Sequence, residues 1–274
     1  MLNTESSSAA AQGNILDKIV IKKLEEIEAA KLKVSIEELK QSEYFSRTCY
    51  SLPQFINDAD RTGIIAEFKR QSPSKGIINS KVTVTEVTQG YAAAGASAIS
   101  VLTDTSFFGG CKEDLIEARK ANEVPLLRKD FMLDEYQVYE AKAWGADIIL
   151  LIAAILTPEQ IQNLAKLAKS LTLNVLLEVH SLEELERSLC DDLDAVGVNN
   201  RNLGNFSVTL NHSYDLVYRI PDQFIKVSES GISDSKTILE LKKVGFNGFL
   251  IGENFMKQEN PGEAMKQFVS ELKA

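Results

Sequence analysis

The sequence contains few of the residues that form disulfide frameworks or metal sites. Its 274 residues include only three cysteines and two histidines. Cys49, Cys111 and Cys190 lie far apart and form no C-x-x-C pattern, which predicts reduced thiols and neither disulfides nor a zinc site. His180 and His212 have no cysteine or aspartate at the spacing of a metal site or a catalytic triad. We expect each to be a surface or hydrogen-bonded histidine.

Long apolar runs and an excess of positive charge are also missing. The longest apolar run, around Ile148 to Leu156, is too short to cross a bilayer, and the first fourteen residues, MLNTESSSAAAQGN, lack the features of a signal peptide. The formal net charge of -9 argues against a nucleic-acid-binding surface. The sequence therefore predicts a cytoplasmic protein that binds neither membrane nor nucleic acid.

From residue 63 onward, short aliphatic runs alternate with segments of helical period, which is typical of βαβ units and a parallel sheet. The eight predicted strands are Ile64–Phe68, Ala98–Leu102, Pro125–Leu127, Asp147–Ile152, Val175–Val179, Ala195–Val198, Phe224–Val227 and Gly248–Ile251. Eight repeats in a chain of this length favour closure into one α/β domain, a (β/α)8 TIM barrel over residues 63–274. The alternative is an open doubly wound sheet, but no G-x-G-x-x-G opens a first helix.

Helix boundary signals support this count of strands. Capping-box patterns begin at Thr83, Thr157 and Ser181, where helices are expected to start. Three helix-to-strand junctions carry a glycine in the same place, and we expect each glycine to adopt a left-handed backbone conformation after its helix. These glycines are Gly95, Gly145 and Gly245.

Residues 1–62 precede the barrel, and we expect them to form a helical extension packed on it. The segment from Asn14 to about Lys31 is amphipathic, and a capping box follows at Ser35. Its apolar stripe either covers one end of the barrel or caps the substrate mouth, and the sequence supports both interpretations equally. The stripe consists of Leu16, Ile19, Val20, Leu24 and Ile27.

Charged and polar residues follow several predicted strands at their carboxyl ends, where barrel enzymes carry their reacting groups. They are Glu67 and Lys69 on strand 1, Arg128-Lys129-Asp130 on strand 3, Glu178 on strand 5, Asn199-Asn200-Arg201 on strand 6 and Ser228-Glu-Ser-Gly231 on strand 7. A rim charge or structural ion pair explains any single one of them, but their coincidence favours a site. Because side chains alternate along a strand, Glu67 and Lys69 should point into the mouth together.

Two of the predicted mouth loops suit a phosphate group. Ser230-Gly231 follows strand 7 and Gly252-Glu253 follows strand 8, the positions at which such barrels commonly bind phosphate through backbone N–H groups. Ser72 to Gly76, after strand 1, supplies further donors and is expected to form a mobile loop over the mouth. The sequence therefore predicts a small phosphorylated substrate.

Seven of these segments together resemble the indole-3-glycerol-phosphate synthase family of tryptophan biosynthesis. The matching segments are IAEFKRQSPSKG (65–76), SVLTD with FFGG (100–110), LRKDFMLDEYQVYEAKAWGAD (127–147), LLEVHSLEELE (176–186), VGVNNRNL (196–203), SESGI (228–232) and FLIGENFM (249–256). The N-terminal ILDKIVIKK (15–23) is also similar to that family. Gln71 and Gly109-Gly110 depart from the usual pattern without removing a catalytic side chain.

The resemblance implies cyclisation of 1-(2-carboxyphenylamino)-1-deoxyribulose 5-phosphate to indole-3-glycerol phosphate, with loss of carbon dioxide and water. It implies that Lys129 is the general acid, that Glu67 orients Lys129 as a salt-bridge partner, and that Glu178 is the general base. Lys69 is expected to contact the substrate carboxylate or phosphate and to deliver a second proton. Asn199 completes the catalytic set by holding sugar hydroxyls.

The resemblance also implies how the substrate is held. The expected substrate-binding residues are Ser72, Phe108, Phe131, Arg201 and Leu250, and the expected phosphate-binding residues are Lys69, Ser230, Gly231, Gly252 and Glu253. Leu133 is a further apolar residue of the mouth loops. We expect no metal and no cofactor, because the chemistry moves only protons and carbon dioxide. The resemblance also makes association with other tryptophan-pathway enzymes an expectation. A lysine Schiff-base aldolase and a non-catalytic phosphosugar-binding barrel are the alternatives.

Overall fold

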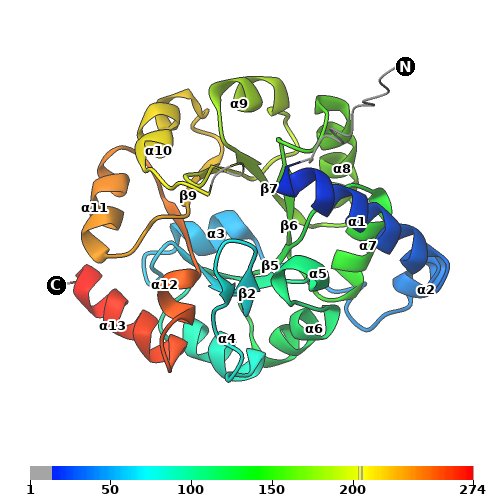
Figure 1. Ribbon diagram of the computed structural model, residues 1–274, viewed down its shortest axis with the longest axis horizontal. Coiled ribbons are helices and arrows are strands. Elements are labelled where there is room, and N and C mark those ends of the chain that lie inside the picture. Colours follow the sequence, from blue (N-terminus) through cyan, green and yellow to red (C-terminus); the bar gives the residue numbers. More distant parts are fainter. Residues whose placement is uncertain (1–13, 203, 205, 274) are drawn as a thin grey trace, which may run out of the picture.

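Eight parallel strands close into a barrel in a computed structural model that describes residues 14–202, 204 and 206–273 (Figure 1). The order around the barrel is β1-β10-β9-β8-β7-β6-β5-β4, and β4 pairs with β1 to close it. The strands are β1 (Ile64–Phe68), β4 (Ala98–Leu102), β5 (Leu126–Lys129), β6 (Ile148–Ile152), β7 (Asn174–Val179), β8 (Ala195–Asn199), β9 (Ile225–Glu229) and β10 (Gly248–Ile251). The predicted (β/α)8 barrel is confirmed, and the open-sheet alternative is wrong.

Helices surround the barrel and cover both of its ends. They are α1 (Ile15–Lys31), α2 (Ile36–Lys40), α3 (Leu52–Asn57), α4 (Val84–Ala93), α5 (Thr105–Phe108), α6 (Lys112–Ala121), α7 (Glu135–Ala143), α8 (Pro158–Ser170), α9 (Leu182–Ser188), α10 (Asn211–Leu216) with a 3-10 turn (Val217–Arg219), α11 (Ser235–Lys243), α12 (Glu253–Met256) and α13 (Pro261–Lys273). A short hairpin, β2 (Gln71–Ser72) with β3 (Gly76–Ile77), forms part of the loop after β1.

The strand boundaries differ from the prediction where a polar residue ends an apolar run. β5 continues to Lys129 and β9 to Glu229, although the apolar pattern predicted ends at Leu127 and Val227. Barrel strands keep their pairing beyond the apolar core, because backbone hydrogen bonding does not depend on the side chain. Lys129 and Glu229 therefore lie on strands, and the loop after β9 begins only after Glu229.

The helix boundary signals are confirmed with one exception. Capping boxes start α2 at Ser35, α4 at Thr83 and α8 at Thr157. Ser181 forms only half of its predicted box, because the Glu184 carboxylate accepts the backbone N–H and a ring contact of His180 instead. The glycines after α4, α7 and α11 have φ values of 92°, 89° and 113°, as predicted for Gly95, Gly145 and Gly245.

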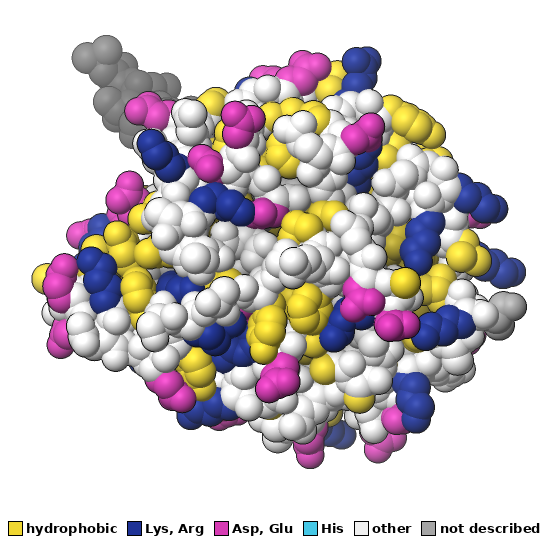
Figure 2. Space-filling model, turned by 180° about the vertical axis from the view of Figure 1, so that it is seen from behind, with side chains coloured by type: hydrophobic (Ala, Val, Ile, Leu, Met, Phe, Trp, Pro, Cys, Tyr) yellow, Lys and Arg dark blue, Asp and Glu magenta, His cyan; other side chains and the backbone are white. Residues whose placement is uncertain are grey.

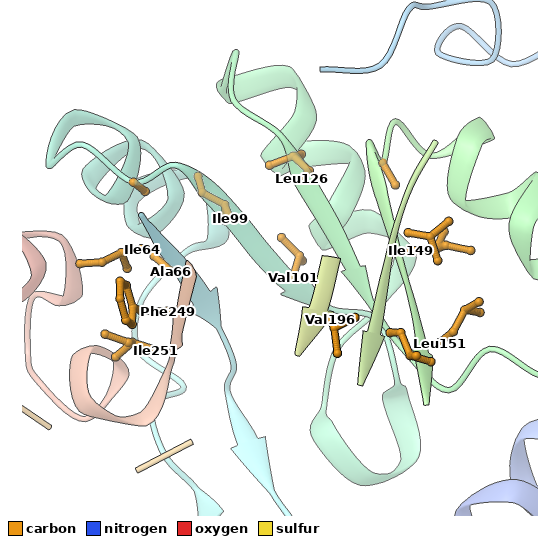
Figure 3. Close-up of a cluster of buried hydrophobic side chains, with 14 of the residues drawn as sticks. Ile64, Ala66, Ile99, Val101, Leu126, Ile149, Leu151, Val196, Phe249 and Ile251 are labelled. Carbon is orange, nitrogen blue, oxygen red and sulfur yellow. The ribbon is translucent and has the colours of Figure 1, made fainter. Parts of the chain in front are cut away.

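Alternation along the strands separates the core into two layers. Outward-facing side chains such as Ile64, Ala66, Ile99 and Val101 pack against the surrounding helices (Figure 3). Inward-facing side chains fill the barrel itself, and they include Ile65, Ala98, Leu127, Ile148, Leu150, Leu176, Ala195, Ile225 and Leu250. Beyond this apolar filling, a layer of charged side chains lies at the end where the strands finish.

The N-terminal segment contacts both ends of the barrel. Leu52 and Ile56 of α3 pack among the inward residues at the amino ends of the strands, and the Leu52 N–H donates to Asn174 Oδ1 at 3.1 Å. At the opposite end, Ile15, Leu16 and Ile19 of α1 line a cavity at the mouth. The predicted stripe is confirmed at Ile19 and Ile27, which are buried, but wrong at Leu24, which is 49% exposed.

The surface seen from behind the view of Figure 1 is mixed in character. Figure 2 shows Lys and Arg side chains interspersed with Asp and Glu on that face, without a field of one sign. No helix in the described part of the chain is long and apolar enough to cross a membrane. The three cysteines are free thiols, as predicted. The predicted lack of a signal peptide concerns residues 1–13, which lie outside the described residues, and the VGVNNRNL segment likewise ends at 203, outside them.

Candidate active site

The carboxyl ends of three strands bring Lys129, Glu178 and Glu229 together inside the barrel. The Lys129 ammonium on β5 donates to Glu178 Oε2 on β7 at 2.8 Å and lies 3.5 Å from Glu229 Oε2 on β9. Glu178 and Glu229 are 3% and 1% exposed. One ammonium therefore lies between two carboxyl groups where little water screens their charges.

The charges in this cluster set the ionisation of Lys129 and Glu178. Burial opposes the ammonium form, but the charges of Glu178, Glu229 and Glu67 outweigh it and raise the pKa of Lys129 above its ordinary value. Burial alone would raise the pKa of Glu178, yet Lys129 and His180 hold this pKa at about 2. Lys129 is thus a protonated ammonium beside the ionised carboxylate of Glu178.

Glu229 was named in the sequence only within the strand-7 segment Ser228-Glu-Ser-Gly231, and no role in the site was assigned to it. Burial raises the pKa of Glu229 to about 7, the charge of Lys129 opposes the rise, and the charges of Glu178 and Glu67 add to it. Its Oε1 atom is buried and has no hydrogen-bond partner within the described chain. The signal was present in SESGI, because an acidic residue that directly follows an apolar run at a strand end is a candidate.

Glu67 and Lys69 form a second ion pair on the inner side of β1. Lys69 Nζ donates to Glu67 Oε1 at 2.6 Å, so the predicted common orientation of these two side chains is confirmed. The expected salt bridge between Glu67 and Lys129 is wrong as a direct contact, because Lys69 takes this carboxylate. Glu67 reaches Lys129 only as one of the charges that raise its pKa.

Asn199 and Arg201 extend the cluster on the β8 side. Asn199 Nδ2 donates to Glu178 Oε1 at 3.1 Å, and Asn199 Oδ1 accepts the Arg201 N–H at 3.0 Å. Arg201 Nη2 lies 3.5 Å from Glu253 Oε2. Asn199 therefore holds the carboxylate that Lys129 also contacts, while Arg201 faces the loop after β10.

His180 is the hydrogen-bonded histidine that the sequence allowed for, and it does not lie on the surface. Its side chain is 14% exposed, with Nε2 3.6 Å from Glu178 Oε1 and Nδ1 3.3 Å from Glu184 Oε2. Burial would lower the pKa of His180, but the hydrogen bond to Glu184 and the charge of Glu178 raise it. His180 thus adds positive potential beside the Glu178 carboxylate.

A cavity of about 150 Å³ lies above this cluster at the mouth of the barrel. Glu67, Lys69, Lys129, Glu178, Asn199 and Glu229 form its charged floor, and its apolar walls are Ile15, Leu16, Ile19, Phe108, Phe131 and Leu250. The Phe108 and Phe131 rings lie 6.0 Å apart between centroids. Leu133 is not in this wall and packs against the outer core. The cavity suits a flat aromatic group above paired acids and bases.

A second cavity of about 520 Å³ adjoins the first around the loops after β9 and β10. Ser230, Gly231, Gly252, Glu253 and Lys69 line it, so the predicted phosphate residues do come together. Gly252 is also required by packing, since a Cβ there would lie 2.5 Å from Glu67 Oε1. The Glu253 carboxylate contacts Lys75 at 3.4 Å as well as Arg201.

The fold and the position of the charged cavity define a class of (β/α)8-barrel enzymes, which carry their reacting groups at the carboxyl ends of their strands. No group of three or more His, Cys, Asp or Glu side chains within the described ranges is arranged to hold a metal ion. The charged floor consists of lysine–glutamate pairs, Lys69 with Glu67 and Lys129 with Glu178.

Comparison with known proteins identifies the family within this class. The family model described as indole-3-glycerol phosphate synthase matches residues 16–268. A protein of that name from Bacteroides thetaiotaomicron is 46% identical over 259 residues, covering 94% of this chain and 99% of its own. Another from Polaromonas sp. is 43% identical, covering 93% and 97%. The chain belongs to the indole-3-glycerol phosphate synthase family and is a decarboxylating lyase of tryptophan biosynthesis that acts on a small phosphorylated substrate.

More distant solved structures share the fold. A mutant tryptophan synthase alpha-subunit from Pyrococcus furiosus has a TM-score of 0.59 at 17% identity, covering 77% of this chain and 98% of its own. The 3-hexulose-6-phosphate synthase from Salmonella typhimurium has a TM-score of 0.58 at 12% identity, covering 76% and 97%. At these identities the likeness shows the barrel alone.

Proposed function

We propose that Lys129 is the general acid of the ring closure and that Glu178 is the general base of the dehydration that follows it. The aromatic carbon that carries the carboxylate attacks the substrate ketone, and Lys129 donates its proton to the developing alkoxide. Carbon dioxide then leaves, and its bonding electrons restore the aromatic ring. The 2.8 Å contact between Lys129 and Glu178 at the floor of the cavity is the observation that carries this assignment.

Dehydration completes the reaction and needs a second acid and a base. Lys69 protonates the departing hydroxyl group so that it leaves as water, and Glu178 accepts the anilino proton. A proton then moves from the neighbouring methylene carbon to the nitrogen, which forms the indole and leaves Glu178 protonated. Glu67 holds Lys69 at 2.6 Å, and Asn199 holds Glu178 at 3.1 Å while contacting the sugar hydroxyls. Glu67 is thus a positioning residue for Lys69.

The substrate lies across the mouth with its two ends in the two cavities. Its aromatic ring fits against Phe108, Phe131 and Leu250, where an apolar wall favours loss of the carboxylate as carbon dioxide. Ser72 lines the same cavity and contacts the substrate, as does Arg201 by charge. The phosphate binds to backbone donors of Ser230, Gly231, Gly252 and Glu253 with Lys69 nearby.

Turnover of 1-(2-carboxyphenylamino)-1-deoxyribulose 5-phosphate tests the function directly. Formation of the indole is followed by absorbance or fluorescence, and we expect a steady rate that inorganic phosphate inhibits by competition. A folded preparation that binds phosphate but forms no indole would identify a non-catalytic phosphosugar-binding barrel instead.

Borohydride trapping tests the Schiff-base alternative. An imine requires a neutral lysine amine, whereas the surrounding carboxylates hold Lys129 as an ammonium. We expect no covalent adduct after substrate and borohydride are mixed with the enzyme. A reduced adduct on Lys129 or Lys69 would replace the acid–base mechanism.

We also infer that residues 1–62 and 63–274 act as one structural domain, since α1 and α3 contact both ends of the barrel. A cytoplasmic location and association with other tryptophan-pathway enzymes stay predictions. Cell fractionation tests the location, and co-purification of other proteins with the intact chain tests the association.

A further inference from the structure

Lys23 is a buried lysine on α1 that the reaction chemistry does not use. It is 4% exposed, and its ammonium lies 2.7 Å from Glu26 Oε2, 2.9 Å from Asp104 Oδ2 and 3.0 Å from Asp130 Oδ1. Glu26 belongs to the same helix, but the two aspartates follow different barrel strands. A single ammonium therefore joins α1 to the ends of β4 and β5.

Each of these two aspartates also fixes an aromatic residue of the cavity wall. Asp104 caps α5 by accepting the Phe108 N–H at 3.2 Å, and Asp130 accepts the Phe131 N–H at 2.8 Å. Asp130 is the residue directly after Lys129. The same side chains that bind Lys23 thus set the backbone positions of Phe108, Phe131 and the strand end that carries the catalytic lysine.

The third wall of the cavity comes from the helix that Lys23 belongs to. Ile15, Leu16 and Ile19 line the cavity together with the two phenylalanines, and Ile19 lies one helical turn before Lys23. No residue of α1 lines the adjoining cavity around Ser230. Lys23 is therefore placed to control the apolar end of the site and not its phosphate end.

The two aspartates that contact Lys23 differ in how many other partners they have. Arg128 and Thr103 also bind Asp130, at 3.1 and 2.6 Å. Asp104 Oδ2, in contrast, is buried and has no hydrogen-bond partner among the described residues, so the Lys23 ammonium is the charge that compensates it. Burial would lower the pKa of Lys23, but Asp130 and Asp104 raise it, so the ammonium persists at neutral pH.

We propose that Lys23 is a positioning residue that assembles the pocket for the aromatic ring, by fixing the α1 wall against Phe108 and Phe131. The proposal rests on the proposed function, because it assumes that the ring binds in this cavity. It assigns to α1 a role in substrate recognition that differs from covering apolar surface. Loss of Lys23 should release the wall while the phosphate loops keep their geometry.

Lys23→Met tests the proposal, with Lys31→Met as the matched control. Lys31 lies on the same helix and pairs with Asp134 at 2.8 Å, but its side chain is 36% exposed and does not line the cavity. We expect Lys23→Met to raise the KM for the carboxyphenylamino substrate about 10- to 100-fold, since displacement of a positioning wall has effects of this order. Lys31→Met should stay within about twofold of the wild type.

Inhibition by inorganic phosphate separates positioning from a general loss of structure. In Lys23→Met, the inhibition constant of phosphate should remain within about twofold of the wild-type value, because no α1 residue lines that cavity. An unchanged KM would overturn the proposal. An equal loss of phosphate and substrate binding would overturn it as well, because the whole site would then have changed.

The double variant Lys23→Met with Asp104→Asn covers the case in which the single variant does not fold. Asparagine keeps the α5 cap and removes the buried charge, so folding should recover while the KM stays raised. A wild-type KM in a folded double variant would contradict the proposal. Failure of the proposed function is distinguishable, because the wild-type chain itself would then form no indole.

Discussion

The charged floor at the barrel mouth contains two lysines and three glutamates within one buried layer. Lys69 pairs with Glu67 and Lys129 with Glu178, which leaves Glu229 as the carboxyl group without a counter-charge of its own. An unpaired buried carboxylate is costly, and the pKa of Glu229 rises to about 7 by burial, against the charge of Lys129. When Glu229 carries a proton, the five side chains together are neutral.

Lys129→Ala should remove most of the turnover and leave the protein folded. General acid catalysis contributes about 10²- to 10⁴-fold, so kcat should fall by a factor of this order. The fold survives because Glu178 and Glu229, 3% and 1% exposed, can take up protons once the ammonium is lost. Steady-state kinetics and circular dichroism measure the two effects. Near-normal kcat in this variant would refute the role of Lys129.

Glu229→Gln should change how stability depends on pH. The folded-state pKa of about 7 exceeds the ordinary value of 4.5. Between these two pH values the folded protein therefore binds one proton more than the unfolded chain, and it loses stability as the pH rises through this range. Removing the group should remove up to about 1.4 kcal/mol per pH unit of this slope. Urea unfolding of both proteins between about pH 5 and 6.5 measures the slope of each. Identical slopes would show that Glu229 does not titrate there.

Much of the site could be predicted residue by residue, because catalytic groups of barrels follow apolar runs at strand ends. Glu67, Lys69, Lys129, Glu178 and Asn199 indeed line one cavity. Their partners could not be predicted, since pairing depends on distances across the barrel that the order of strands does not give. Lys129 faces β7 and β9, so its partners are Glu178 and Glu229 and not Glu67.

At the scale of elements, two of the glycines that follow helices differ in how closely their neighbours pack against them. Gly145 and Gly245 both have positive φ, but a Cβ at Gly145 would lie 2.5 Å from Arg119 Cγ, whereas at Gly245 the nearest atom is 3.7 Å away. Gly145→Ala therefore adds a clash to the backbone strain that both variants share. These turns were predictable from the sequence because glycine tolerates the left-handed conformation.

We expect Gly145→Ala to destabilise the protein by more than about 1 kcal/mol, and Gly245→Ala by about 1 kcal/mol from strain alone. Unfolding midpoints in urea at constant m-value compare the two. Equal losses would mean that the Arg119 side chain moves aside at no cost. The sequence could not rank these glycines, because Arg119 of α6 and Gly145 after α7 meet only in the folded protein.

At the scale of the whole molecule, the two ends of the barrel have different tasks. The amino end carries the buried Asp147, whose carboxylate accepts from Arg47 Nη2 and the Tyr50 N–H at 2.7 Å, and from Arg119 Nη1 and the Leu126 N–H at 2.8 Å. These bonds connect the N-terminal segment to the sheet. The groups that we propose for catalysis all lie at the other end.

Asp147→Ala should cost about 3 to 5 kcal/mol of stability, because it leaves the Arg119 charge buried without its partner. The KM of the remaining folded enzyme at low temperature should stay near the wild-type value. Asp222→Ala is the control, since Asp222 pairs with Lys226 on the surface and should leave the unfolding midpoint nearly unchanged. A large change in KM for Asp147→Ala would mean that the two ends are coupled.

Closure of the barrel by β1 and β10 also has a consequence during synthesis. Ile64 pairs with Phe249 and Ile65 with Leu250, so the first barrel strand needs the last one as its neighbour. At ordinary translation rates, about 10 to 40 s pass between their emergence. Over that time the growing sheet has an open edge that can pair with another nascent chain. Ribosomes closely spaced on one message would therefore expose many such edges together, and a chaperone that covers β1 would raise the yield of closed barrels.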